Sequence, residues 1–270
     1  MSFNCKGLKR SLEGVRSLCN RGDIVALQET WLLPHDIPLL GTISDDFSYT
    51  GKSAVDTSVG ILRGRPYGGV AILWRKNAFS SVTFLDCDND RLIACKFMIN
   101  SECSVLIICV YMPTESTENL IEFTQCLSEI YAIIDGSETE SVIILGDFNA
   151  HPGGLFYKEL MDFSEEQQWR CADIEHLGLN SGTYTFISDS HGCFRWLDHC
   201  ITTKLNSNII VKVNIQYDVF WSDHFPMEIE CNFSLVRYKT KLKMHTPNKI
   251  IWGDRTLNKL TITVLHVIIA

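Results

Sequence analysis

Nine short apolar, β-prone runs restrict the fold of this chain more than any other feature of its sequence. Three amphipathic stretches between them are predicted helices, and many strands with few helices favour an α/β fold in which two sheets pack face to face under covering helices. The predicted strands are Ile24–Leu27, Gly69–Trp74, Val82–Leu85, Leu92–Ile99, Val105–Tyr111, Val142–Leu145, Thr183–Ile187, Trp196–Cys200 and Met227–Cys231. The predicted helices are Leu8–Cys19, Glu118–Ile134 and Gly154–Phe163.

The charge of the chain is distributed unevenly. The 270 residues carry a net charge of −8 and are enough to bury one large core. Residues 234–270 contain seven Lys or Arg and one acidic residue, so residues 1–233 carry −14. An acidic body argues against binding a polyanion by bulk charge, and it favours a site in which carboxylates surround a metal ion. We therefore predict one domain over residues 1–233, followed by a basic tail over residues 234–270.

The cysteines and the apolar segments indicate in which cellular compartment the protein works. The 11 cysteines are an odd number with no CxxC pair. Several lie within apolar runs, as Cys95 and Cys109 do, so we predict buried free thiols in a reducing compartment. No apolar stretch reaches the length of a membrane span, and residues 1–10 lack the apolar core of a secretory signal. We expect no membrane association.

Four apolar runs end directly at polar residues of the kind that bind metals or phosphates. The polar residues at these ends are Glu29, Tyr111, Asp147 with Asn149, and Asp198. Sheet folds place their sites at strand ends because the backbone leaves the core there and side chains can converge. These residues, although distant in sequence, are therefore predicted to form one site.

The segment Gly146-Asp147-Phe148-Asn149 combines a carboxylate with a carboxamide. In an extended segment Asp147 and Asn149 point to the same side, and Phe148 points into the core. The carboxylate can hold a metal or deprotonate water, and the amide can donate a hydrogen bond to a phosphate oxygen. An Asx turn after a strand explains the same residues equally well. Beside other carboxylates, Glu29 is a natural Mg²⁺ ligand, because Mg²⁺ takes hard oxygen ligands.

The segment Ser222-Asp223-His224-Phe225-Pro226 contributes a histidine. Histidine titrates near neutral pH, and a catalytic histidine needs a carboxylate to fix its tautomer. Asp198, on a different predicted strand, is the candidate partner of His224, whereas Asp223 is free to serve a metal. A surface turn closed by Pro226 is the ordinary alternative.

Six motifs occur together in the order of one known family. They are Asn4, Leu27-Gln28-Glu29-Thr30, Tyr111-Met112-Pro113, Gly146-Asp147-Phe148-Asn149, Leu197-Asp198-His199 and Ser222-Asp223-His224. Over residues 2–233 the chain resembles the endonuclease/exonuclease/phosphatase superfamily, whose fold is a DNase I-like four-layer α/β sandwich of two mainly antiparallel sheets flanked by helices. It most resembles the apurinic-type endonuclease of a LINE (non-LTR) retrotransposon, truncated before the reverse transcriptase, and residues 250–255 resemble the linker to that enzyme.

The resemblance implies a role for each site residue. Glu29, Asn4 and Asp223 would bind the metal, which would be Mg²⁺ or Mn²⁺. Asp147 would activate water, and His224, held by Asp198, would stabilise charge on the phosphate. Tyr111 and Asn149 would contact the phosphate, while Asn4, Thr185 and Arg195 would contact the substrate. The partner would be DNA, the protein would be a monomer, and a DNA substrate implies a nuclear location, with the cytoplasm as the other compartment.

Three departures from the family pattern keep alternatives open. Lys6 stands where repair enzymes carry an acidic residue, which argues against abasic-site specificity. Arg195 replaces a usual serine, and only Met1–Phe3 are left for a shortened first strand. One alternative is therefore an inactive or domesticated remnant that binds nucleic acid or a partner. Another is a phosphatase or nucleotide phosphodiesterase of the same fold, and a third is an unrelated α/β domain.

Overall fold

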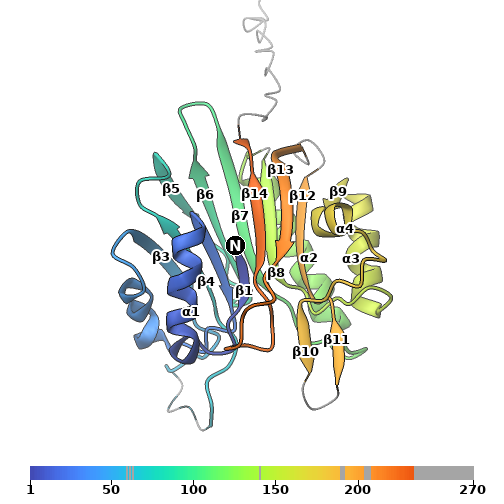
Figure 1. Ribbon diagram of the computed structural model, residues 1–270, viewed down its shortest axis with the longest axis horizontal. Helices are drawn as coiled ribbons and strands as arrows, with labels where there is room; N and C mark the ends of the chain where they lie inside the picture. Colours follow the sequence, from blue (N-terminus) through green and yellow to red (C-terminus); the bar gives the residue numbers. More distant parts are fainter. Residues whose placement is uncertain are drawn as a thin grey trace, which may run out of the picture. The chain divides into compact units, whose positions relative to one another are not determined.

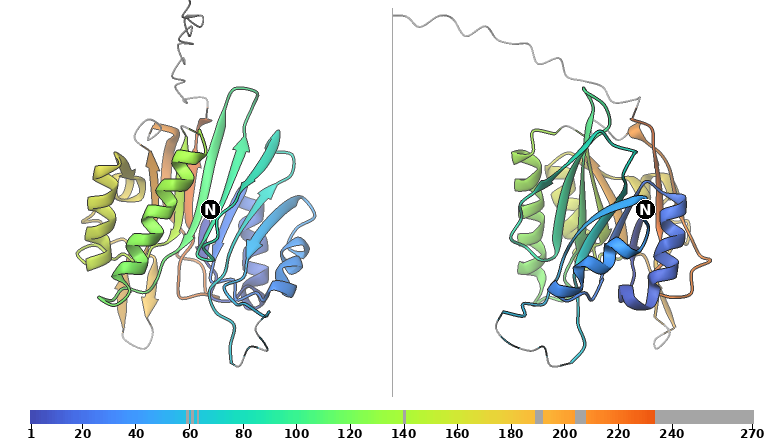
Figure 2. Two further views of the ribbon diagram at one scale, coloured as in Figure 1. Left: turned by 180° about the vertical axis from the view of Figure 1, so that it is seen from behind. Right: turned by 90° about the vertical axis from the view of Figure 1, so that its left-hand side faces the viewer.

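Two six-stranded sheets pack face to face between layers of helices. The computed structural model describes residues 1–58, 60, 62, 64–139, 141–188, 192–203 and 208–233, so the predicted basic tail, residues 234–270, lies outside the described residues. Helix α1 (Leu8–Arg21) lies over one sheet, and α2 (Leu120–Gly136) and α3 (Leu155–Glu166) lie over the other (Figures 1 and 2). The predicted four-layer α/β sandwich is confirmed.

Each sheet combines a parallel pair of strands with antiparallel neighbours. The first sheet contains, in spatial order, β13 (Ile210–Ile215), β14 (Met227–Cys231), β1 (Ser2–Asn4), β2 (Ile24–Gln28), β4 (Val70–Arg75) and β3 (Phe47–Lys52). The second contains β5 (Ser81–Leu85), β6 (Leu92–Met98), β7 (Ser104–Tyr111), β8 (Val142–Asp147), β12 (Asp198–Thr203) and β9 (Trp169–Cys171). The parallel pairs are β1 with β2 and β7 with β8.

Three shorter features complete the described fold. They are the 3₁₀ segment η1 (Pro34–Thr42), the short helix α4 (Ala172–Leu177) and a hairpin of β10 (Phe186–Ser188) and β11 (Cys193–Arg195) that projects beside the second sheet (Figure 1). No helix among the described residues is long and apolar enough to cross a membrane. All 11 cysteines fall within the described part of the chain and are free thiols, and most of them are buried.

The apolar runs of the central strands are continuous because both of their faces are buried. On β8, Ile143 and Leu145 point into the core between the sheets, whereas Val142 and Ile144 point toward the helices α2 and α3. A third cluster, which includes Leu18 and Leu27, lies between the first sheet and α1. Side chains of this size stabilise the fold by about 1.5–3 kcal/mol each when fully buried. The strands therefore hold both layers of helices while their polar ends stay free for a site.

The structure differs from the sequence-based prediction mainly at the edges of the sheets. The edge strands β3 and β13 were not predicted. β3 has few apolar residues, whereas the apolar residues of β13 are interrupted by Lys212 and Asn214. The predicted strand Thr183–Ile187 is wrong over its first residues, because the strand there is β10, which begins at Phe186. The predicted strand Trp196–Cys200 begins only at Asp198, where pairing with β8 starts.

Candidate functional site

Most of the predicted site residues line one cleft of about 630 Å³. Asn4 ends β1, Gln28 ends β2, Tyr111 ends β7 and Asp147 ends β8, so the carboxyl ends of both parallel pairs contribute. Glu29, Tyr111, Asp147, Asn149, Arg195, Asp223 and His224 all line the cleft. The site therefore includes residues of both sheets.

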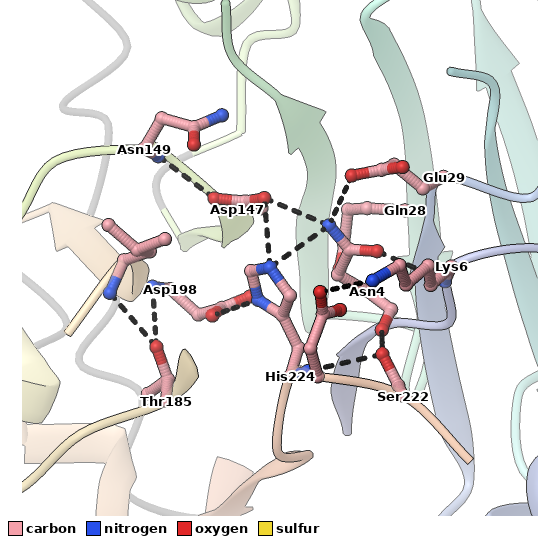
Figure 3. A network of polar contacts seen from close by, with 12 residues as sticks. Asn4, Lys6, Gln28, Glu29, Asp147, Asn149, Thr185, Asp198, Ser222 and His224 are labelled. Carbon is pink, nitrogen blue, oxygen red and sulfur yellow. Dashed lines mark hydrogen bonds and ion pairs between the residues drawn. The ribbon is translucent and has the colours of Figure 1, made fainter. Parts of the chain in front are cut away.

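Asp147 lies at the centre of the site and is almost fully buried (Figure 3). Its Oδ2 accepts a hydrogen bond from Asn4 Nδ2 at 2.9 Å, and its Oδ1 accepts one from the backbone N–H of Asn149 at 2.9 Å. Burial raises the pKa of Asp147 to about 7, with the negative charge of Asp198 adding to this, while His224 opposes it. The carboxyl group of Asp147 therefore titrates close to neutral pH.

The glycine before Asp147 allows β7 and β8 to pair closely at the site. Gly146 has a φ of 151°, and a Cβ built there would lie 2.0 Å from the carbonyl oxygen of Val110 on β7. Only glycine fits this close approach without strain. Gly146 thus holds Asp147 at the end of a parallel strand pair, beside Tyr111, its partner in register.

Asp198 and His224 form a buried pair behind Asp147. His224 Nδ1 lies 2.8 Å from Asp198 Oδ2, and His224 Nε2 lies 3.7 Å from Asp147 Oδ2 (Figure 3). Asp198 faces Asp147 directly across the β8–β12 ladder. Burial alone would lower the pKa of His224, but the charges of Asp198 and Asp147 raise it to about 10. The imidazole is therefore cationic at neutral pH, with its Nε2 turned toward the cleft.

Glu29 and Asn4 form the opposite side of the site. Glu29 Oε1 accepts a hydrogen bond from Asn4 Nδ2 at 3.0 Å, and Glu29 Oε2 accepts one from Trp31 Nε1 at 3.0 Å. Glu29 has a φ of 50°, which ends β2 abruptly and turns the side chain out of the sheet. Asn4 thus joins Glu29 of the first sheet to Asp147 of the second through a single amide group (Figure 3).

Tyr111 and Asn149 lie along the cleft, each half-buried. Burial, together with the charges of Glu29 and Asp147, raises the pKa of Tyr111, so its phenol stays protonated and can donate a hydrogen bond. The predicted extended segment around Asn149 is wrong, because its φ is 50° and its backbone N–H closes an Asx turn on Asp147. The side-chain amide of Asn149 donates to the carbonyl of Met112 at 2.9 Å.

The remaining predicted site residues occupy different positions. Arg195 is exposed and lines the cleft. Asp223 is half-buried, and its carboxylate pairs with the Lys6 ammonium at 2.5 Å. The predicted substrate contact at Thr185 is wrong, because this side chain is fully buried. Its hydroxyl instead accepts hydrogen bonds from the backbone N–H groups of Leu197 and Asp198 at 2.9 and 3.0 Å. Thr185 therefore positions Asp198.

Sequence reasoning missed the buried pair of His199 and Asp173. His199 Nδ1 lies 2.8 Å from Asp173 Oδ2, and His199 Nε2 lies 2.8 Å from the carbonyl oxygen of Ala150, directly after Asn149. Burial opposes protonation of His199, but the charge of Asp173 raises its pKa above the ordinary value. This pair ties β12 and α4 to the turn that carries Asn149. The histidine next to Asp198 was the one signal in the sequence that could have indicated it.

Among the described residues, three sets of side chains have the chemistry to hold a metal ion, and one of them, Cys171, Asp173 and His199, is buried and does not line the cleft. Ligand atoms of Asp147, Asp198 and His224 lie within 4.8 Å of one another, but the imidazole lies between the two carboxylates, 2.8 Å from Asp198 and 3.7 Å from Asp147. Glu29 offers hard oxygen atoms at the wall of the cleft, and its hydrogen-bond donors among the described residues, Asn4 and Trp31, are neutral. A Mg²⁺-like ion needs one or two carboxylates and takes its other ligands from water and phosphate. Glu29 therefore fits such an ion.

Known proteins with this fold include several nucleases. A model of the Endonuclease/Exonuclease/phosphatase family matches residues 1–224. Among solved structures, an AP endonuclease from Leishmania major is 14% identical with a TM-score of 0.68, and it covers 84% of this chain and 85% of its own. An AP endonuclease from Archaeoglobus fulgidus is 18% identical with a TM-score of 0.66. A 3′–5′ exonuclease from Neisseria meningitidis is 18% identical with a TM-score of 0.63, and for both of these the match covers 86% of this chain and 98% of theirs.

Proposed function

The chain belongs to the endonuclease/exonuclease/phosphatase family, and from that membership and its cleft we propose that it is a divalent-metal-dependent phosphodiesterase that nicks DNA. The observation that carries the proposal is the buried row of Asp198, His224 and Asp147, which faces Glu29 across Asn4. This row pairs a carboxyl group that titrates near neutral pH with a cationic imidazole. In the proposed mechanism the carboxylate activates water and the imidazolium stabilises charge on the phosphate.

Asp147 is the proposed general base. A general base works best when its pKa lies near the working pH, and the pKa of Asp147 is raised to about 7. Asn4 and the Asn149 backbone hold its two oxygen atoms in fixed directions. The carboxylate can therefore take a proton from a water molecule that attacks the phosphorus, without first reorienting.

His224 is the proposed stabiliser of charge on the phosphate. Asp198 accepts the hydrogen bond of Nδ1, so the second N–H of the imidazolium, at Nε2, is directed toward the cleft. Negative charge grows on the phosphate oxygens in the transition state, and a preorganised cationic donor in a buried site commonly contributes about 10²–10³-fold in rate. Tyr111 adds a neutral phenol donor along the same cleft.

Glu29, with Asn4 beside it, is the proposed metal-binding side of the cleft. A bound Mg²⁺ or Mn²⁺ ion would polarise a phosphate oxygen and stabilise the leaving oxygen. The protein's own part is to hold the Glu29 carboxylate in place through the hydrogen bonds from Asn4 and Trp31. Asp223 is a weaker candidate as a ligand, because Lys6 already pairs with it.

The substrate and the origin of the chain are also part of the proposal. The open cleft carries Lys6 and Arg195 on its walls, which suits a charged phosphodiester backbone. The product would be a nick with a free 3′ hydroxyl. The motifs around Asn4, Glu29 and Asp198 support descent from a LINE-type retrotransposon endonuclease, and a DNA substrate would place the activity in the nucleus.

A plasmid-nicking assay tests the proposed function. Supercoiled plasmid is incubated with the wild type, Asp147→Ala and His224→Ala, in Mg²⁺ and in EDTA. Two controls, Asp162→Ala and His176→Ala, remove exposed side chains of the same types on α3 and α4. We expect Mg²⁺-dependent nicking in the wild type and both controls, and a loss of about 10²-fold or more in the two site variants. Extension of the nick by a polymerase without prior end repair would identify the 3′ hydroxyl.

Other results point to the alternatives. Folded wild-type protein that does not nick DNA, but releases phosphate from 3′-phosphorylated ends or nucleotides, supports a phosphatase of the same fold. Folded protein with neither activity supports a remnant that only binds. Glu29, Asp147 and His224 line one cleft, which argues against the unrelated α/β domain.

A further inference from the structure

Lys6 places a fixed positive charge in the cleft. Its Nζ lies 2.5 Å from Asp223 Oδ2, and both residues line the cleft with Glu29 and Asp147. Lys6 has a φ of 46°, and its backbone N–H donates to Asn4 Oδ1 at 3.1 Å. The residue is therefore anchored to the centre of the site by its main chain, while its half-exposed side chain reaches across to Asp223.

The carboxylates around Asn4 differ in their cationic partners. Asp198 and Asp147 lie 2.8 and 3.7 Å from the nitrogen atoms of His224, and Asp223 pairs with Lys6. Glu29 is the one of these four carboxylates that has no cationic partner among the described residues, since Asn4 and Trp31 are neutral donors. An added cation is therefore attracted to Glu29, whereas at Asp223 it would have to displace an ammonium group.

We propose that Lys6 takes the place of a second metal ion, so that the cleft binds a single divalent ion, at Glu29. The proposal rests on the proposed metal-dependent function and adds the number of ions and the residue that sets it. A divalent ion at Asp223 would also lie next to the displaced ammonium, and the two cations would repel each other. One hydrogen of the ammonium is used by Asp223, which leaves two to donate to a phosphate oxygen of the substrate.

The proposal is tested by counting bound ions. Mn²⁺ is titrated into the full-length chain and followed by calorimetry and by the loss of free-Mn²⁺ EPR signal. We expect one ion for the wild type, two for Lys6→Gln, and one again for Lys6→Gln combined with Asp223→Asn. The matched control is Lys9→Gln, which removes a lysine of the same helix region whose partner, Asp36, lies outside the cleft. The control should bind one ion.

A kinetic readout checks the role of Lys6 toward the phosphate. Loss of a charge-assisted hydrogen bond should raise the KM of Lys6→Gln for DNA by about tenfold at low Mn²⁺. High Mn²⁺ should reduce this defect, because the second ion replaces the missing charge, whereas Lys9→Gln should keep the wild-type KM throughout. Circular dichroism and urea unfolding confirm that each variant is folded.

The outcomes separate this inference from the function on which it rests. Two ions on the wild type, or one ion on folded Lys6→Gln, would overturn the role of Lys6 and leave the metal-dependent function intact. An ion that persists in Glu29→Gln would overturn the site assigned to the ion here and leave metal dependence intact. No ion on the wild type would overturn both proposals.

Discussion

The hydroxyl of Thr185 offers a sharp test of how the site is held in place. It accepts the backbone N–H groups of Leu197 and Asp198, and the carbonyl of the same residue accepts the N–H of Phe225, next to His224. Thr185 thus links both members of the Asp198–His224 pair without entering the cleft. Replacement by valine keeps the shape of the side chain and removes only the acceptor.

The size of the effect follows from the two N–H groups that bond to the hydroxyl. The bond from Asp198 is buried and that from Leu197 is partly buried, and a buried unsatisfied donor costs about 1–3 kcal/mol. We therefore expect Thr185→Val to lower the free energy of unfolding by about 2–4 kcal/mol. Thr185→Ser keeps the hydroxyl and loses one methyl group, which costs about 1 kcal/mol. Only the serine variant keeps the hydroxyl acceptor. The difference in free energy of unfolding between the two variants therefore measures the contribution of that acceptor.

Urea unfolding of the wild type and both variants gives the comparison, with the m-value as a check on two-state behaviour. The nicking rate is measured in parallel, and we expect Thr185→Val to lose more activity than Thr185→Ser because Asp198 no longer has a fixed backbone. Equal stability of the valine and serine variants would refute the reasoning. It would mean that the two N–H groups find other acceptors or water.

Three further predictions concern the helix behind the site, the close approach of the strands and the pH profile. Gly14→Ala should destabilise the fold and slow nicking although alanine favours helices, because its Cβ would lie 2.0 Å from the Trp221 ring. Adding Trp221→Leu to the same chain should recover part of the lost stability, as measured by thermal unfolding. Gly146→Ala should cost about 3 kcal/mol or more in urea unfolding, because it combines a glycine-only φ with a backbone clash. With increasing pH, kcat/KM should rise through about pH 7 as Asp147 deprotonates and fall through about pH 10 as His224 loses its proton. A profile without the fall at alkaline pH would contradict the role of the imidazolium.

The centre of the site was predictable because its residues follow strands that the sequence marks clearly. The runs before Glu29, Tyr111 and Asp147 are apolar on both faces, since each strand is covered by a sheet on one side and helices on the other. Such runs show where a strand ends, and the end of a buried strand shows where polar side chains can gather. The position of His224 was inferred from the chemistry of its motif and from its need for a carboxylate.

The parts that escaped prediction depend on partners distant in sequence. Thr185 looks like a surface threonine in the sequence, and only the fold shows that its hydroxyl faces the first residues of β12. Lys6 and Asp223 are far apart in the chain, and nothing in either segment indicates the ion pair between them. The edge strands β3 and β13 contain polar residues within their runs, Ser48, Thr50 and Lys52 in β3 and Lys212 and Asn214 in β13, which hide them in the sequence.

The two halves of the site belong to different sheets, so the packing of the sheets sets the distances between its residues. Asn4 at the end of β1 donates to Asp147 at the end of β8, and His224, just before β14, bonds to Asp198 at the start of β12. Each of these contacts crosses from one sheet to the other. The distance between base and imidazolium is therefore set by the apolar core that separates the sheets. Cores of this kind are close-packed and resist compression. The catalytic groups are therefore in place before a substrate binds, and binding does not have to supply the free energy of ordering them.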